Sequence, residues 1–543
     1  MLVSNEWKDY KILKTSKGMK LESWKNVLLL RPDPVITWDL GDFSNYKINA
    51  VYHRSNTGGG HWENKMKTAI TPTRSENFSE WYQNLIVAAD LAESAPVRGC
   101  MTIKPYGWAI WELMRDEMDR RIKSYGVQNA NFPLLIPIEF FNKEAQHVDG
   151  FAKESAVVTH HRLKMIDGKL QPDPESKLTE PYIIRPTSET IIGEAMSRWI
   201  QSYRDLPMKL NQWVNVMRWE MRPRMFLRTS EFNWQEGHNV FATHEEANAD
   251  ARKMHKMYGD YMREILAIPS IMGEKTPEER FAGADHTYTL EHIMQDGKAL
   301  QAGTSHDLGQ HFSKSFNIQF LGTDGKLQHA WTTSWGTTTR MMGSMFMVHS
   351  DDDGLILPPF VAPYQVVIIP ITRDDTATAL NEYAESLGEK LRSVGVRVLV
   401  DTSDMRAPDK MWKWIKRGVP LRVEIGAREM ESGDVTITRR DIGRESKRTI
   451  AAEELVATVN DIMAQIHSDM VARVEKRNND MIHNIADLTE LDSALSNGEI
   501  GFFRIKYDMT KCPEFDDLMD KHKITRRCLD DNDPSYVFVA KSY

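Results

Sequence analysis

Arginines, carboxylates and aromatic rings alternate in one segment of this chain, VNVMRWEMRPRMFLRTSEFNWQEGH. Arg218 and Glu220 share the alternation of one expected strand, and Arg228, Phe232 and Trp234 share that of the returning strand. Because side chains two residues apart on a strand point to the same side, a β-hairpin would line these groups up on one floor. Guanidinium groups bind phosphate and carboxylate as a fork, so we expect a polyanionic ligand here.

A polar loop in IIRPTSET could add to that floor. Thr187 or Ser188 can cap the helix that follows, which needs no function. Alternatively the loop holds a small cation, with Glu189 accepting a hydrogen bond from an ammonium group. Capping is the simpler interpretation of these residues alone.

The segment KALQAGTSHDLGQH contains a third group of candidates. We expect it to turn at Gly303 into a helix that begins at Thr304, since glycine lets the backbone approach a ligand closely. Gln301 and His306 would flank that gap. Capping or core contacts explain His306 equally well.

Arg340 stands where a β-rich run, TTSWGTTT, meets a methionine-rich helix. We expect a break in the run at Gly336, and we assign the methionines to core packing. An arginine at such a junction can pair with phosphate or with a structural carboxylate. Both interpretations stay open.

Periodicity indicates the elements that must position these groups. Helices are expected over 77–94, in a stretch ending near Ser124, and over 245–265. A strand over 131–138 contains Pro133 and Pro137, which cannot donate to a ladder, so it belongs at an edge or interface. Before residue 71, tryptophans favour a small folded extension over a disordered tail, but no function can be read from it.

Length and composition indicate a soluble chain of three or four domains, because 543 residues exceed what one core supports. Three cysteines are too few for a disulfide scaffold and suit a reducing compartment, so we expect a cytoplasmic protein. The N-terminus shows no export or organellar signal, and the apolar runs are too short for a membrane helix.

Residues 361–466 alternate between strands and helices, which predicts a small α/β domain. The net charge of the chain is -8, but residues 406–448 contain twelve Lys and Arg against seven Asp and Glu. Such a charge run is usually a solvated face, and an RNA-binding surface is a fair alternative. The candidate RNA-binding residues are Lys413, Lys416, Arg417, Arg439 and Arg440.

Several of these motifs, in this order, resemble class II aminoacyl-tRNA synthetases. Arg218-Trp219-Glu220 with the RTSE run at Arg228 is similar to the second signature of that class, and Gly336 to Arg340 is similar to the third. The wording of RPTSETI, NQWVNVMRWE, TSEFNWQEGH, KALQAGTSH and TTSWG resembles prolyl-tRNA synthetases of the eukaryotic and archaeal type. The resemblance runs from about residue 71 to the C-terminus.

The resemblance implies an α+β catalytic domain, built on an antiparallel sheet flanked by helices, at 71–360. An α/β anticodon-binding domain at 361–466 and a small α+β domain at 467–543 would follow, with 1–70 as an extension of unknown role. It also implies a homodimer that attaches proline to tRNA(Pro) with ATP and Mg²⁺. Relatives often hold zinc in the last domain with four cysteines, whereas only Cys512 and Cys528 occur there, so we expect no zinc.

The resemblance also implies roles for individual residues. Arg218 would bridge the proline carboxylate and the α-phosphate, and Arg218 and Arg340 would be the catalytic arginines. The implied proline-binding residues are Thr187, Glu189, Arg218, Trp234, His306, Trp335 and Gly336. The implied ATP-binding residues are Arg218, Glu220, Arg228, Thr229, Phe232, Gln301, Thr304, Thr338 and Arg340.

Two other functions are compatible with the motifs. One is a synthetase of the same class for another small amino acid, of which threonine is the nearest; the lack of an active-site zinc-ligating cysteine argues against it. The other is a non-enzymatic RNA-binding paralogue, which would typically lose phosphate-binding arginines. A pocket for a small apolar ring also discriminates weakly, because one methylene is worth about 1 to 3 kcal/mol, so alanine or cysteine could be activated too.

Overall fold

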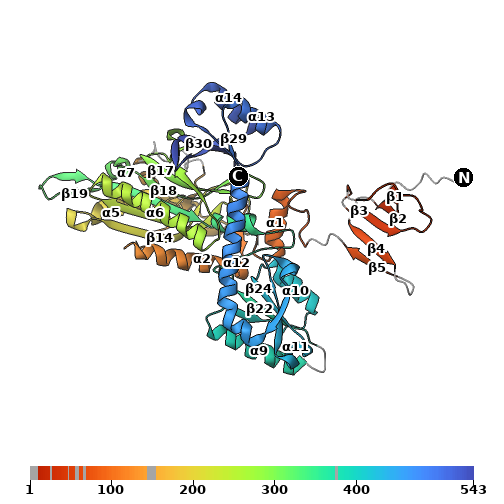
Figure 1. Ribbon diagram of the computed structural model, residues 1–543. Coiled ribbons are helices and arrows are strands. Elements are labelled where there is room, and N and C mark those ends of the chain that lie inside the picture. Colours follow the sequence, from red (N-terminus) through yellow and green to blue (C-terminus); the bar gives the residue numbers. More distant parts are fainter. Residues whose placement is uncertain are drawn as a thin grey trace. The chain divides into compact units, whose positions relative to one another are not determined.

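The computed structural model describes residues 10–24, 27–43, 45–46, 48–54, 60–64, 69–143, 154–372 and 377–543, with backbone alone at 60–64 and 143. The chain forms two compact units, Met1–Thr71 and Pro72–Tyr543, and each is described by itself (Figure 1). In the described part, every helix is too short or too polar to cross a membrane.

The first unit is a five-stranded sheet in the order β1-β2-β3-β4-β5. The strands are β1 (Tyr10–Ser16), β2 (Met19–Trp24), β3 (Val27–Pro32), β4 (Ala50–Arg54) and β5 (Gly60–Asn64). Leu21, Leu30 and Val51 form its core. Burial alone would raise the pKa of Glu22, but hydrogen bonds from Arg31 and Tyr10 lower it to about 2. The extension is therefore folded, as its aromatic residues predicted.

A seven-stranded sheet, in the order β16-β17-β18-β21-β15-β14-β8, forms the centre of the second unit (Figure 1). Adjacent strands of this sheet are antiparallel, except that β14 and β8 are parallel. The strands are β8 (Gln128–Asn129), β14 (Met208–Met217), β15 (Glu231–Phe241), β16 (Ile271–Glu274), β17 (His286–Ile293), β18 (Ala299–Asp307) and β21 (Trp331–Thr338). This sheet and its helices form an α+β core, the fold class expected from the sequence.

Helix α6 (His244–Glu264) covers one face of this sheet. Thr243 caps the helix in a capping box with Glu246, and Tyr258 packs edge-on against Trp335 with ring centroids 6.3 Å apart. The Trp335 ring lies over Gly237 of β15, where any side chain would collide with it. The residues of the opposite parity point to the other face, which borders a cavity.

Several expected elements differ from the structure. The helix expected over 77–94 ends at Ala88, and residues 92–94 form a strand. The returning strand begins at Glu231, so Arg228 lies before it, in a connection with a tight turn in which Arg224 N donates to the Arg228 carbonyl. The helix expected at Thr304 is also wrong: β18 continues through Gly303 to Asp307, since β17 and β21 pair with it on both sides. Pairing on two edges outweighs a local glycine signal.

Shorter elements surround the central sheet. The helices are α1 (Phe78–Ala88), α2 (Pro105–Ser124), α3 (Ile138–Lys143), α5 (Glu189–Trp199), α7 (His311–Ser315) and α8 (Arg340–His349). The strands are β6 (Ala92–Ser94), β7 (Met101–Ile103), β9 (Leu135–Pro137), β10 (Val157–His160), β11 (Leu163–Ile166), β12 (Lys169–Pro172), β13 (Lys177–Ile184), β19 (Gln319–Leu321) and β20 (Leu327–His329). Because β9 is an outer strand in the order β10-β13-β9, the edge position predicted from Pro133 and Pro137 is confirmed.

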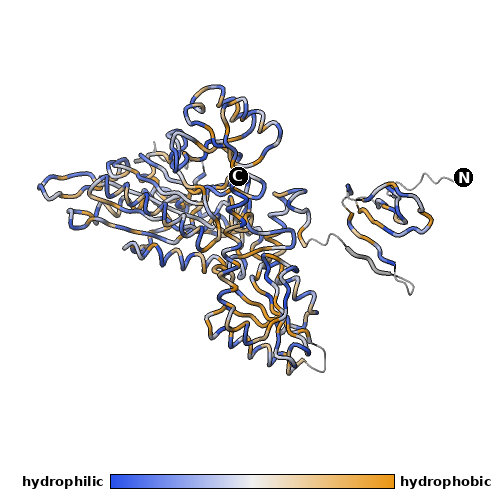
Figure 2. The backbone as a smooth tube through the Cα atoms, in the orientation of Figure 1, coloured by the Kyte–Doolittle hydropathy of each residue, from blue (hydrophilic) through white to orange (hydrophobic). Residues whose placement is uncertain are grey.

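A five-stranded sheet in the order β23-β22-β24-β25-β26 follows. Its strands are β22 (Val366–Pro370), β23 (Val398–Val400), β24 (Leu421–Ile425), β25 (Asp434–Arg439) and β26 (Arg448–Ala451), with helices α9 (Ala377–Ser393), α10 (Ala407–Lys416) and α11 (Ala427–Ser432). Figure 2 shows hydrophobic residues concentrated in its central strands, and Val366 to Ile369 are fully buried. The predicted alternation of strands and helices is confirmed.

Helix α12 (Ala452–Asp480) connects that sheet to the C-terminal domain. It is one continuous helix, so the boundary expected at 466 falls inside it. The C-terminal domain has a sheet in the order β27-β28-β30-β29, with strands β27 (Ile482–Asn484), β28 (Phe502–Lys506), β29 (Ile524–Asp530) and β30 (Asp533–Lys541), and helices α13 (Leu488–Ser496) and α14 (Pro513–His522). Short 3₁₀ turns occur at Pro174–Ser176, Tyr203–Asp205, Pro277–Glu279, Gly443–Ser446 and Tyr507–Thr510.

Buried histidines should make the fold sensitive to acid. Burial lowers the pKa of His292 to about 4 and the pKa of His349 to about 3. A histidine whose pKa is lowered by folding contributes stability at neutral pH that is lost as the pH falls below about 6.5. Each of these histidines should therefore lower the free energy of unfolding by about 2 kcal/mol between pH 6.5 and pH 5.

His349→Gln tests this expectation, because a glutamine amide can replace the ring nitrogen that lies 2.8 Å from the Leu266 carbonyl. Thermal unfolding at pH 7 and pH 5 should show a smaller loss of stability on acidification for the variant than for the parent chain. Equal losses would contradict the role of His349.

Candidate active site

A cavity of about 500 Å³ lies on the open face of the central sheet. Cross-strand neighbours form its floor: Glu236 is opposite Gly336, which is opposite Thr304, and in the next row His238 is opposite Ser334, which is opposite His306. Loops before α5 and after β14 and β16 complete the wall. Residues from six separate stretches of the chain therefore meet in one space.

Four arginines line this cavity: Arg218, Arg228, Arg280 and Arg340. The Arg218 guanidinium lies 5.6 Å from the centre of the Phe232 ring and 5.5 Å from that of Trp234, and its Nε donates to the Pro186 carbonyl at 2.9 Å. Burial lowers the pKa of Arg218 from its usual value. Aromatic faces and a backbone acceptor thus fix the guanidinium at the cavity wall.

Arg340 begins α8, as the sequence predicted, and its Nε donates to the Leu227 carbonyl at 3.0 Å. Burial, together with the nearby charges of Arg228 and Arg218, lowers the pKa of Arg340 to about 10. Cations held close together in a buried space repel, and a polyanion would relieve that repulsion. The arrangement is therefore electrostatically suited to a polyphosphate.

The C-terminal residue reaches this group of arginines. Arg228 Nη2 donates to a main-chain oxygen of Tyr543 at 3.0 Å, and the Tyr543 hydroxyl donates to Asp296 at 2.6 Å. The Lys298 ammonium lies 4.8 Å from the centre of the Tyr543 ring. The end of the chain is therefore held beside the cavity.

Two carboxylates, Glu189 and Glu236, line the same cavity as Arg218. Glu189 accepts a short hydrogen bond from Thr187. The negative charge of Glu189 raises the pKa of Arg218 and so opposes the effect of burial, which lowers it. Glu236 is buried and accepts hydrogen bonds of 2.5 Å from both Ser188 and Gln212. A secondary ammonium group would find charge-matched acceptors here.

Two histidines on the floor have pKa values that are shifted in opposite directions. Burial opposes protonation of His238, but Glu236, 3.0 Å away, raises its pKa. The Nδ1 of His306 lies 3.0 Å from the Thr287 hydroxyl, and burial lowers the pKa of His306 to about 3. His306 is therefore a neutral ring at physiological pH, packed against Phe281 with ring centroids 4.7 Å apart.

The remaining residues predicted for proline and ATP lie around the same cavity, with one correction. Those lining it are Thr187, Glu220, Thr229, Phe232, Trp234, Gln301, Thr304, Gly336 and Thr338. Trp335 lines the cavity too, and its ring packs against Tyr258 of α6. The run is not broken at Gly336 as expected, since β21 pairs with β15 and β18 there.

Some residues of the wall were not foreseen from the sequence. Lys275, Arg280 and Phe281 follow β16 and line the cavity, and Lys275 is 5% exposed. No local motif marks them, because they come into place through strand pairing of β16 with β17. The alternation that places Trp234 on the floor also places Glu236 there, and it could have pointed to His238.

The basic residues predicted to bind RNA are mostly engaged within the protein. Arg440 is 5% exposed and makes a bidentate pair with Asp351, at 2.5 and 2.8 Å. Arg417 pairs with Asp90 at 2.8 Å. Arg439 pairs with Asp441 and Asp469, at 2.8 and 2.5 Å. Lys413 lies 3.5 Å from Asp401, and Lys416 is half-buried at the end of α10.

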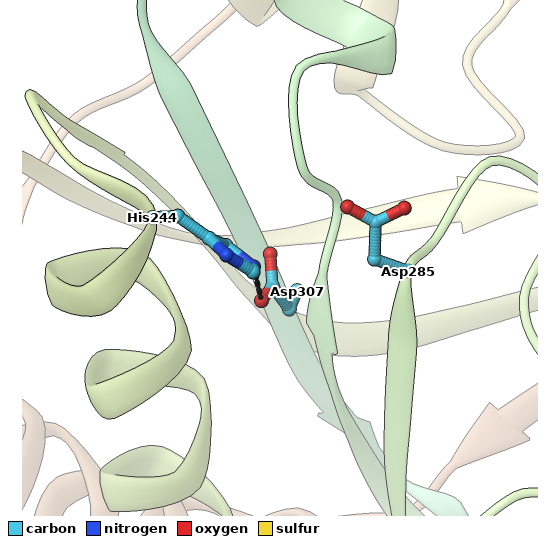
Figure 3. Close-up of side chains that lie close together, drawn as sticks. All are labelled: His244, Asp285 and Asp307. Atoms are coloured by element: carbon cyan, nitrogen blue, oxygen red, sulfur yellow. Dashed lines mark hydrogen bonds and ion pairs between the residues drawn. The ribbon is translucent and has the colours of Figure 1, made fainter.

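Cysteine, histidine and aspartate side chains that could hold a metal occur at more than one place in the described part of the chain. Cys512 donates to the Met509 carbonyl, His522 lies 2.6 Å from Asp492, and Cys528 is buried in a separate place against Gly273. Figure 3 shows the cluster of His244, Asp285 and Asp307. His244 Nε2 lies 2.9 Å from Asp307, which also accepts hydrogen bonds from Asn248 and the Gly309 amide, so the buried carboxylate is already satisfied.

Comparison with known proteins agrees with this geometry. Residues 173–349 match the tRNA synthetase class II core domain (G, H, P, S and T), and residues 365–462 match the anticodon binding domain. The fold is thus that of a class II aminoacyl-tRNA synthetase.

Curated relatives narrow the class. A proline–tRNA ligase of Akkermansia muciniphila is 50% identical over 474 residues, covering 85% of this chain and 94% of the relative. One from Bdellovibrio bacteriovorus is 49% identical over 500 residues, covering 88% and 99%. One from Paramagnetospirillum magneticum is 54% identical over 415 residues, covering 74% and 81%. The chain belongs to the proline–tRNA ligase family. These relatives are bacterial, so they do not support the expected eukaryotic and archaeal type.

Proposed function

We propose that the cavity on the central sheet is where this chain forms prolyl-adenylate. As a proline–tRNA ligase, the chain attaches proline to tRNA(Pro) with ATP in two steps, releasing pyrophosphate and then AMP. The observation that carries the site assignment is that Arg218, Arg228 and Arg340 line the same cavity as the acceptor carboxylates Glu189 and Glu236. Their charges complement those of ATP and of a zwitterionic amino acid.

In the first step, a proline carboxylate oxygen bonds to the α-phosphorus while the bond to the β-phosphate oxygen breaks. Two anions must meet, so the reaction needs alignment and positive charge more than a general base. Arg218 would hold both the carboxylate and the α-phosphate, and its fixed position between two rings removes the cost of ordering it. Arg228 and Arg340 would hold the other phosphates.

The remaining wall residues divide between the two substrates. We assign Phe232 to stacking on the adenine, with Glu220, Thr229, Gln301, Thr304 and Thr338 around the nucleotide. Thr187 and Glu189 would accept from the prolyl ammonium group, and Trp234, His306 and Gly336 would border the ring. A neutral His306 fits this role because it adds no charge next to the ammonium.

Mg²⁺ fits this donor set as a companion of ATP. Gln301 and Thr304 offer neutral oxygens on the nucleotide side of the wall, and Mg²⁺ usually keeps several waters and takes few protein ligands. Bound with ATP, the ion would neutralise charge on the β- and γ-phosphates.

In the second step, a terminal ribose hydroxyl of the tRNA attacks the prolyl carbonyl, and AMP leaves. We propose that the tRNA anticodon contacts the domain at 361–466, which contains Lys413 and Lys416, and that the catalytic domain is 71–360 and the last domain 467–543. We further propose a cytoplasmic homodimer.

Amino-acid specificity tests this function. ATP–pyrophosphate exchange, run separately with each amino acid, should be stimulated most by proline, and tRNA(Pro) should then be charged. Threonine-dependent exchange without proline-dependent exchange would overturn the assignment. Exchange with alanine or cysteine at a lower kcat/KM would instead measure how selective the ring pocket is.

Lys416→Glu tests the proposed tRNA surface. A phosphate contact contributes through positive charge, so its reversal should lower kcat/KM for tRNA(Pro) about tenfold and leave proline-dependent exchange unchanged. Lys390→Glu, the same charge change on α9, is the matched control. Equal effects of the two variants, or loss of exchange, would contradict a tRNA contact at Lys416. Arg440 is unsuitable for this test because it pairs with Asp351.

A further inference from the structure

One wall of the cavity is formed by the segment that follows β16. Lys275, Glu279, Arg280 and Phe281 all line the cavity, and the Phe281 ring packs on His306. The Lys275 amide donates to the Thr287 carbonyl, which extends the pairing of β16 with β17 by one residue. The position of this wall thus depends on what holds residues 273–281, a stretch called here the β16 wall.

Buried ion pairs link the C-terminal domain to the β16 wall. Lys275 Nζ lies 3.0 Å from Glu291 Oε1, and the other oxygen of Glu291 accepts from Arg527 Nη2 at 2.7 Å and Nε at 3.1 Å. Glu291 is fully buried, and Arg527 belongs to β29 of the C-terminal domain. Burial would raise the pKa of Glu291, but the two cations lower it, so the carboxylate is held ionised.

Two further contacts join the same parts. The Tyr507 hydroxyl of the C-terminal domain donates to Glu278, at 3.2 Å from Oε2. Gly273 packs so closely on β29 that any side chain there would collide with the Leu529 carbonyl oxygen and press on the Cys528 sulfur. Packing, a hydroxyl and an ion pair therefore hold the β16 wall at three separate residues.

We propose that the C-terminal domain positions the β16 wall for amino-acid activation, with Arg527 as the positioning residue that acts through Glu291 on Lys275. Arg527 and Lys275 share one buried carboxylate, so removing either cation leaves that charge incompletely paired, which is costly in a buried place. Lys275 would then turn toward Glu291 more completely and withdraw from the cavity. The domain would thus serve the first chemical step, in the absence of tRNA.

This inference rests on the proposed function, and its test separates the two. In the full-length chain, Arg527→Gln is compared with Arg504→Gln, whose arginine belongs to the same domain and pairs with Asp530 at 2.6 Å. Proline-dependent exchange is measured without tRNA. Failure of the parent chain to exchange with proline would overturn the proposed function. With an active parent, we expect Arg527→Gln to lower kcat/KM at least about tenfold and Arg504→Gln to change it less than about twofold.

A double-mutant cycle distinguishes positioning from general damage. If Arg527 acts through Lys275, Arg527→Gln should have little further effect in a Lys275→Gln background, and Arg527→Lys should recover part of the lost exchange. Additive losses, or equal exchange by the Arg527 and Arg504 variants, would overturn the proposal.

Tyr507→Phe provides a variant that keeps the packing if Arg527→Gln does not fold. Loss of the hydroxyl that reaches Glu278 should lower kcat/KM about threefold with the unfolding temperature unchanged. Unchanged kcat/KM in Tyr507→Phe would then overturn the proposal.

Discussion

Arg218→Ala is expected to lower proline-dependent ATP–pyrophosphate exchange by about 10³-fold. The guanidinium is fixed between Phe232 and Trp234 and is the one group assigned to both reacting anions. Loss of a single preorganised donor to developing charge costs about 10² to 10³ in rate, and Arg218 would serve two anions. Steady-state exchange at saturating ATP and proline measures the effect.

Arg222→Ala is the control for this variant, because Arg222 lies in the same connection and is exposed. It should retain nearly full exchange. Exchange by Arg218→Ala within tenfold of the parent chain, with circular dichroism unchanged, would remove Arg218 from the mechanism.

Glu189→Gln is expected to lower kcat/KM for proline by about 100-fold and to leave the KM for ATP nearly unchanged. The side chain keeps its shape but loses the charge that would accept from the prolyl ammonium group, and a hydrogen bond to a charged group is worth about 1.5 to 3 kcal/mol. Exchange measured over a range of proline concentrations gives both constants.

Glu194→Gln is the matched control, since Glu194 lies on the same helix and pairs with Arg198 at 2.8 Å. It should behave like the parent chain. An equal rise of KM for ATP and for proline in Glu189→Gln would contradict its assignment to the amino acid.

The sequence predicts elements best where one local signal decides them. The alternation of strands and helices predicted for 361–466 is one case: in β24, Leu421, Val423 and Ile425 are buried at every second position, and Pro420 and Gly426 bound the strand. Pro133 and Pro137 predicted the edge position of β9 because proline lacks a donor. Arg340 at the start of α8 was predicted from a change of period.

Predictions that required tertiary contacts were the weaker ones. Gly303 suggested a helix start, yet two neighbouring strands extend β18 through it. Trp335 lines the cavity, but its ring packs against Tyr258, a contact that no local pattern predicts. Arg440 was predicted to bind RNA because the sequence does not reveal its partner, Asp351, which is 89 residues away in the chain. Likewise, no local pattern links Arg527 to Lys275.

A crystal structure with a non-hydrolysable sulfamoyl analogue of prolyl-adenylate tests the central claim most directly. The adenine should stack on Phe232, Arg218 should contact the sulfamoyl linkage, and the pyrrolidine nitrogen should lie within hydrogen-bond distance of Glu189. An analogue bound outside this cavity, or bound with its pyrrolidine ring away from Glu189 and His306, would contradict the account.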